Sequence, residues 1–431
     1  MRTVGIPILF VMLCACTPTP PCQEAMEMAG SERSGVLTIG TDIGSIVSQV
    51  FAPTGLGRYP DGAPVVVYVH GGWRTNFVPI DESVSHINPG LGLVQLYLNL
   101  PGGRLGDGYD SEGREDKRGG EARAALAAVL RYAAGTEVDT DGCRLSDRID
   151  SPLSGQLALA GYSNGGNLAW ATLADPSLEL PEVIGVATYE TPAADQFIVV
   201  EPGTLENPSP VYIEDTCTLT DGIRCDYDYS GLAFDADAED DGVLFIDEAG
   251  DGTFDGGDFR LGAVKHDGRW HHSLPARQAA IAQGLTLTNR ASPEDTASFW
   301  GEREAPRQIA DAVARFPDIA GVSVGSEQDH VLTGAVEHPH VTGMITAMRA
   351  ADIRWSRLHP DSAYTTLISR SGQDFPDLDA NLEVEIGADL PLMPYTAAAH
   401  GEDYLTAAVV ELLDRSHDAQ WESNLDAVIY R

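Results

Sequence analysis

From residue 64 onward, short continuous apolar runs alternate with segments in which apolar residues recur at helical spacing. Each apolar run is short and ends at turn residues, which is typical of a buried strand. Continuous apolar strands that alternate with helices indicate a mostly parallel sheet covered on both faces. The predicted strands lie at 64–72, 92–103, 156–163, 182–192, 319–330 and 353–360, and the predicted helices lie near 117–135, 165–174, 302–315, 341–351 and 403–415.

The alternation stops between residues 195 and 275, where Asp, Gly and Tyr become frequent and turn signals recur. We interpret this segment as an insertion that caps the sheet. The predicted fold class is therefore α/β, with a mostly parallel central sheet, helices on both faces and a Cys- and Asp-rich cap insertion. The sheet domain is predicted in two parts, 35–194 and 276–431.

The N-terminus, MRTVGIPILFVMLCAC, has one Arg near its start, then an apolar run, then small residues. The run is shorter than the roughly 20 residues that a membrane-spanning helix needs. Leu13-Cys14-Ala15-Cys16 resembles a bacterial lipobox, which implies a signal peptide over 1–15 and lipidation of Cys16. We expect a flexible tether over 16–34 and a cell-envelope location, at the outer membrane, with the lipid anchor as the one membrane contact.

The formal net charge of −38 argues against nucleic-acid binding, because phosphates would be repelled. An exported chain permits disulfides. Cys217 and Cys225 lie eight residues apart in a loop-like segment and are predicted to pair. For Cys22 and Cys143 the sequence leaves open either a bond between them or two thiols.

The run LALAGYSNGGNLAW places Gly161-Tyr162-Ser163-Asn164-Gly165 directly after a predicted strand and before a predicted helix. That is the context in which a Gly-x-Ser-x-Gly motif holds a nucleophile on a sharp turn. The hydroxyl of Ser163 would then point toward the N-terminus of a helix, where backbone N–H groups favour negative charge. We predict Ser163 to be a nucleophile.

A second motif, VHGGW at residues 69–73, follows an earlier predicted strand. Its two glycines allow the backbone to turn N–H groups toward a substrate oxygen. The backbone N–H groups of Gly72 or Trp73, together with that of Asn164, are predicted to form an oxyanion hole.

With both motifs in this order, the chain resembles the α/β-hydrolase superfamily over about 64–194 and 300–415. VYVHGGW and GYSNGG favour its dienelactone-hydrolase and prolyl-oligopeptidase-like branches. The resemblance implies a nucleophile, an acid and a histidine in that chain order, with the acid after a late strand and the histidine before the last helix.

The same order is found from the residues themselves. Asp329 lies at the end of the predicted strand 319–330, where a carboxylate could orient an imidazole; Glu190 and Glu327 are alternatives. His400 lies just before the last helix and is the preferred base, with His359 as the alternative.

The segment 235–258 holds ten carboxylates in 24 residues and no Lys or Arg. Two overlapping stretches, starting at Asp237 and at Asp247, resemble the EF-hand calcium loop, although each departs from it at one or more places. We predict a structural Ca²⁺ site and no cofactor for catalysis. The candidate ligands are Asp237, Glu239, Asp241, Asp247, Glu248, Asp251, Asp255 and Asp258.

These features predict a lipid-anchored serine hydrolase that acts on small carboxylic esters through an acyl-enzyme. A prolyl-oligopeptidase-like peptidase is the alternative enzyme, with a peptide substrate. A calcium-dependent binding lipoprotein on an inactive hydrolase scaffold is the alternative from another class.

Overall fold

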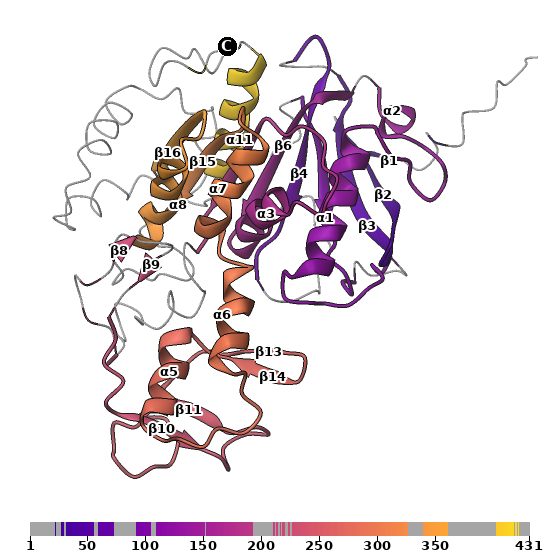
Figure 1. Cartoon of the computed structure of the whole chain (residues 1–431). Coiled ribbons are helices and arrows are strands. Elements are labelled where there is room, and N and C mark those ends of the chain that lie inside the picture. The colour runs from indigo at the N-terminus through magenta and orange to yellow at the C-terminus, as the bar shows by residue number, and fades with distance from the viewer. Residues whose placement is uncertain are drawn as a thin grey trace, which may run out of the picture.

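A computed structural model describes residues 22, 27–29, 32–55, 59–72, 92–104, 109–150, 152–192, 210–211, 213, 216, 218–219, 223–224, 226–325, 339–360, 402–417, 419 and 421. In these residues a central sheet of nine strands has the order β1-β2-β3-β5-β4-β6-β7-β15-β16 (Figure 1). The strands are β1 (Glu27–Ala29), β2 (Glu32–Thr41), β3 (Gly44–Pro53), β4 (Ala63–Val69), β5 (Val94–Leu98), β6 (Pro152–Tyr162), β7 (Gly185–Tyr189), β15 (Ala320–Gly325) and β16 (Trp355–Pro360).

The sheet is parallel from β5 to β16 and antiparallel from β1 to β5. After β4 the chain crosses to β5 on one side, and after β5 it returns to β6 on the other side of β4. The strand order therefore reverses between β4 and β6, and in open α/β sheets ligands bind beyond the carboxyl ends of the strands at such a point. The mostly parallel sheet predicted from the sequence is confirmed.

Helices cover both faces of the sheet. A core on one face packs residues of α1 (Gly120–Ala133), α3 (Asn164–Ala174), α7 (Ala305–Arg315) and α8 (Pro339–Ala350) against the strands. On the other face, α11 (Glu402–His417) packs its apolar residues against the same strands, behind the sheet in Figure 1. A short helix, α2 (Leu145–Arg148), precedes β6. In the part of the chain that the structure describes, no helix is both long and apolar enough to span a membrane.

The predicted tether over 16–34 needs a correction. Glu27–Ala29 forms β1, and β2 begins at Glu32 and pairs along its length with β3. Leu37, Ile39, Ile46 and Val50 of this hairpin are buried against the helices of the first core. The hairpin thus extends the sheet by antiparallel strands that bury only part of their side chains, so they lack the continuous apolar runs of the parallel strands.

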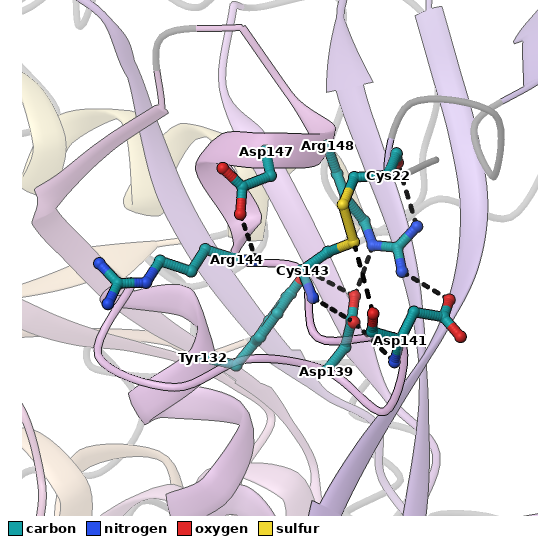
Figure 2. The surroundings of a disulfide bond; sticks show 8 residues. All are labelled: Cys22, Tyr132, Asp139, Asp141, Cys143, Arg144, Asp147 and Arg148. Carbon is teal, nitrogen blue, oxygen red and sulfur yellow. Dashed lines mark hydrogen bonds and ion pairs between the residues drawn. A yellow bond between two sulfur atoms is a disulfide. The ribbon is translucent and has the colours of Figure 1, made fainter. Parts of the chain in front are cut away.

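Cys22 is joined to Cys143 by a disulfide, which resolves the pairing that the sequence left open (Figure 2). Arg148 is 2% exposed and ion-paired with Asp139. It also donates to the Cys22 carbonyl oxygen at 3.1 Å, while Asp139 accepts from the Cys143 N–H at 3.0 Å. A buried ion pair therefore holds the backbone at both ends of the disulfide, and fastens the N-terminal segment to the sheet domain.

Replacing Cys22 and Cys143 together by serine is expected to lower the free energy of unfolding by about 2–4 kcal/mol, because this disulfide closes a loop of 121 residues in the unfolded chain. Denaturant unfolding of the variant and the wild type, without reductant, measures the difference. Dithiothreitol should then lower the wild-type stability and leave that of the variant unchanged, unless Cys217 and Cys225 also form a disulfide. Equal stability of the two proteins without reductant would contradict the prediction.

A separate lobe, residues 226–301, lies at one end of the sheet and leads through α6 back to α7 (Figure 1). It contains a sheet of β10 (Leu232–Asp235), β11 (Val243–Ile246) and β12 (Phe259–Arg260), and a hairpin of β13 (Val264–His266) and β14 (Arg269–His271). Its helices are α5 (Leu274–Ala282) and α6 (Pro293–Gly301). A short hairpin of β8 (Thr218–Leu219) and β9 (Ile223–Arg224) precedes it.

The lobe ends later along the chain than the predicted insertion over 195–275. Ala276 and Ala280 of α5 share a buried cluster with Leu232, Leu244 and Ile246, and Phe299 and Trp300 of α6 pack on Val264. The two helices that follow residue 275 therefore belong to the lobe. The lobe thus has apolar clusters of its own.

The lobe contains two buried histidines, from which we expect its stability to depend on pH. His272 is held at Nδ1 by the Gly262 carbonyl at 2.9 Å and accepts at Nε2 from the Arg290 Nε–H at 3.2 Å, so the neutral ring fits and a second ring proton would face a guanidinium. Burial and the charge of Arg290 lower the pKa of His272 to about 3. Burial lowers the pKa of His271 to about 4.

In the unfolded chain each histidine binds a proton near pH 6.5, whereas in the folded lobe it does so only near pH 3–4. The free energy of unfolding is therefore highest above pH 6.5 and falls as the pH is lowered toward 3–4. We expect a loss of about 1.4 kcal/mol per pH unit for each histidine in this window. His272→Gln keeps a donor and an acceptor but does not titrate. Hydrogen exchange of the lobe between pH 6.5 and 4 should show that this variant loses less stability in acid than the wild type. Equal losses in the two proteins would contradict the role given to His272.

Candidate active site

Ser163 lies on a strained turn between β6 and α3. It is the N-cap of α3 and has φ 51° and ψ −127°, a conformation that residues with a side chain rarely adopt. The turn is held on both sides, since the Ser163 N–H donates to the Tyr189 carbonyl at 2.8 Å and the Ser163 carbonyl accepts from the Gly166 N–H at 3.0 Å. Such strain persists only where the surroundings fix it, and it is concentrated at functional sites.

The glycine after the serine is required by close packing. A Cβ atom at Gly165 would lie 2.1 Å from the Val69 carbonyl oxygen at the end of β4. Helix α3 therefore starts directly against the strand that leads into the second motif. The sequence Gly-x-Ser-x-Gly lets β6, α3 and β4 meet at one point.

The His-Gly-Gly segment lies beside the serine. Val69 of β4 is in register with Gly161 of β6, and a Cβ atom at Gly71 would lie 2.6 Å from the Ser163 Cβ. Gly72 has φ 77°, a left-handed conformation that glycine adopts without strain. The structure thus places Ser163, with Asn164 next in the chain, beside Gly71, the residue that precedes Gly72, while Trp73 lies outside the described residues.

Asn164 is the first residue of α3 and is 2% exposed. The backbone N–H groups at the start of a helix point out along its axis, and the Ser163 side chain makes no capping hydrogen bond to them. An anion above this turn would be stabilised by these groups and by the helix dipole. The arrangement provides a hydroxyl and a nearby set of backbone donors, which are the elements of acyl transfer.

The predicted acid and base lie outside the described residues. Asp329 and Glu327 follow β15, and His400 precedes α11, so the order of elements is the one expected, although the side chains are not described. His359 lies within β16, with its backbone in register with Val324 of β15. The strand position of His359 differs from the loop position that the resemblance implies for the base.

Glu190 lies next to the serine turn. It follows β7 directly, has φ 45° and is 6% exposed. Its Oε1 accepts from the Tyr189 hydroxyl at 2.9 Å, and the Tyr189 carbonyl in turn accepts from Ser163. A second residue with a strained backbone therefore lies next to the Ser163 turn, and Glu190 stays the alternative acid.

The eight predicted calcium ligands are all described, and two ligands of the stretch that starts at Asp237 form ion pairs within the lobe. The seventh to tenth places of this stretch, residues 243–246, form the buried strand β11. Glu239 forms an ion pair with Arg260. Asp241 accepts hydrogen bonds from Lys265, Trp270 and Asn289. These hydrogen bonds lower the pKa of Asp241, and the one from Lys265 has the largest effect.

In the second stretch, Asp247 accepts from the backbone N–H groups of Gly250, Asp251 and Gly252. Asp258 accepts from those of Glu248 and Asp255. Among the described residues, no group of three or more His, Cys, Asp or Glu side chains is arranged so that it could hold a metal ion. The Ca²⁺ site stays a prediction, and the predicted lipidation at Cys16 and the bond between Cys217 and Cys225 concern residues outside those described.

One site residue had no signal in the sequence that we interpreted. Arg118 is 2% exposed and donates from Nη2 to the carbonyl oxygens of His70 and Gly71, at 3.1 and 2.9 Å. It lies in the Lys-Arg-Gly-Gly segment before α1, 48 residues after His70. The unusual sequence Lys-Arg-Gly-Gly at the start of that helix is the feature that could have indicated a role for Arg118.

No protein-family model matches the chain, and no curated protein does. Among solved structures, the chain is similar to carboxyl esterase 2 from Tuber melanosporum, with 10% identity over 91% of this chain and 93% of the other and a TM-score of 0.41. It is similar to an esterase from Pyrobaculum calidifontis, with 12% identity over 89% and 84% and a TM-score of 0.41. It is also similar to prolyl oligopeptidase B from Galerina marginata, with 12% identity over 78% and 34% and a TM-score of 0.39. Function is therefore inferred from the site itself.

Proposed function

We propose that the chain is a serine hydrolase that acts on carboxylic esters. The observation that carries the proposal is the strained turn at Ser163, which lies against Gly71 and leads directly into the start of α3. A serine hydroxyl beside two sets of backbone donors suits attack on an acyl carbon and stabilisation of the oxyanion that forms.

In the proposed reaction the Ser163 oxygen bonds to the acyl carbon while His400 takes its proton, and Asp329 orients the imidazole. The N–H groups of Gly72, Trp73 and Asn164 stabilise the oxyanion. The tetrahedral intermediate expels the alcohol, which takes the proton from His400. Water, deprotonated by the same histidine, then attacks the acyl carbon, and the second tetrahedral intermediate expels the Ser163 oxygen, which takes the proton back from His400 as the acid is released.

A fluorophosphonate probe tests this function, because it bonds covalently to an activated serine. The wild type should be labelled at Ser163, as located by mass spectrometry of the modified peptide, and Ser163→Ala should not be labelled. A folded wild-type protein that the probe does not label would overturn the proposal and favour a binding protein on an inactive scaffold. Turnover of a panel of esters and of blocked peptides distinguishes an esterase from a peptidase.

We also propose that the chain is exported and anchored by a lipid on Cys16. The disulfide between Cys22 and Cys143 supports export, since disulfides persist in oxidising compartments. Metabolic labelling with a palmitate analogue should mark the wild type and not Cys16→Ser. Equal labelling of both would contradict the anchor.

A further inference from the structure

The segment before α1 has an unusual backbone. Lys117 and Arg118 both have left-handed φ angles, 57° and 67°, although neither is glycine. Asp116 stabilises the segment by accepting from the N–H groups of Gly119 and Glu121, at 2.9 and 2.6 Å. Two consecutive residues in this conformation are costly, so the contacts that fix them are expected to serve a function.

The turn directs the Arg118 side chain beneath the His-Gly-Gly segment. Its Nη2 donates to the His70 and Gly71 carbonyl oxygens, and the Gly71 oxygen also lies 2.8 Å from Nδ1 of His70. Burial lowers the pKa of Arg118 to about 10, while Glu115 and Asp116 raise it, so the guanidinium is charged at neutral pH. Hydrogen bonds from a charged donor are the stronger kind.

These contacts fix the direction of a candidate oxyanion donor. The Gly71 carbonyl and the Gly72 N–H belong to the same peptide unit, and the described residues contain no cis peptide bond. In a planar trans peptide the C=O and N–H bonds point in opposite directions. With the Gly71 oxygen held by Arg118 and His70, the Gly72 N–H must face the other way.

A second buried arginine holds the turn itself. Arg303, between α6 and α7, donates from Nε to the Lys117 carbonyl at 2.6 Å and from Nη2 to the Asp116 carbonyl at 2.9 Å. The same guanidinium donates to the Phe299 carbonyl and lies 3.8 Å from the centre of the Phe299 ring. The base of the lobe is thus connected through Arg303 and Arg118 to the backbone beside Ser163.

We propose that Arg118 is a positioning residue that directs the Gly72 N–H toward the substrate oxyanion, and that Arg303 acts on the site through Arg118. The inference rests on the proposed hydrolase function. It adds a connection between the lobe and the oxyanion hole, carried by two arginines that donate to backbone carbonyls.

The test compares Arg118→Met and Arg118→Lys with the wild type on an activated ester. Because a misplaced oxyanion donor weakens binding of the transition state and not of the ester, we expect kcat to fall about 10- to 100-fold in Arg118→Met, with KM changed less than about 3-fold. Affinity for a trifluoromethyl ketone, which forms an oxyanion on the serine, should fall in parallel. Arg118→Lys, which keeps one charged donor, should be intermediate.

Arg315→Met is the matched control, since Arg315 also donates to backbone carbonyls, those of Leu173, Asp175 and Leu178, at the far end of α3. It should keep the wild-type kcat. Arg303→Met should lower kcat in the wild type and have no further effect in Arg118→Met, because the two residues act in series.

The outcomes separate the two proposals. A wild type that the fluorophosphonate does not label overturns the hydrolase function and this inference with it. A labelled wild type with unchanged kcat and ketone affinity in a folded Arg118→Met overturns this inference alone. An equal loss of kcat in Arg315→Met does so too, because the effect would then be one of general stability.

Discussion

Ser163→Ala is expected to lower kcat on an activated ester by about 10³-fold or more while the protein stays folded, because the nucleophile is lost and the scaffold is not. The backbone contacts of the turn are made by the Ser163 N–H and carbonyl, which alanine retains. Initial rates over a range of ester concentrations measure the loss. Turnover within tenfold of the wild type would show that Ser163 is not the nucleophile.

Ser163→Gly is a control that also lacks the serine hydroxyl but is expected to differ from Ser163→Ala in stability. At φ 51° and ψ −127° a Cβ atom is strained by about 1–3 kcal/mol, and glycine removes that strain. Glycine loses about 0.5–1 kcal/mol more conformational freedom on folding. We therefore expect Ser163→Gly to be equally inactive but about 1 kcal/mol more stable than Ser163→Ala. The reverse order of stability would argue that the turn is not strained.

The strand–serine–helix unit was predictable because its signal is local. The apolar run of β6, the glycines and the helical spacing of α3 lie within a few residues of one another, and the structure confirms each element. The contact between Arg118 and Gly71 joins two loops 47 residues apart and depends on two left-handed residues. No periodicity in the sequence encodes such a contact, so the positioning of the His-Gly-Gly segment by Arg118 could not be predicted.

The same reasoning explains the errors in the predicted boundaries. Helix α5 has apolar residues that pack on the lobe, but its sequence alone does not say which core it faces. The β2–β3 hairpin lies on the antiparallel side of the sheet, where Ser34 and Gly35 are half-buried and the apolar run is interrupted. Periodicity predicts what kind of element forms, whereas its partner is decided by tertiary packing.

A buried ion cluster joins the last strand of the sheet to the last helix. Glu411 of α11 binds Arg357 of β16 at 3.1 Å and Arg415 of α11 at 2.9 Å, and all three side chains are at most 2% exposed. The Arg415 guanidinium also lies 4.3 Å from the centre of the Trp355 ring. The cluster therefore joins the strand that precedes residues 361–401 to the helix that follows them, and this part of the chain carries His400, the predicted base.

Glu411→Ala is expected to lower the free energy of unfolding by about 3–5 kcal/mol, because two buried guanidinium groups lose the carboxylate that they share. Glu411→Gln should cost less, since its amide oxygen still accepts a hydrogen bond while the charge is lost. The matched control is Glu239→Ala, which removes an ion pair with Arg260 in which both side chains are about half exposed, and it should cost less than about 1 kcal/mol. Denaturant unfolding of the three variants tests the ranking. If the two alanine variants lost equal stability, the cluster would contribute no more than a surface ion pair, and the apolar contacts of α11 alone would hold it on the sheet.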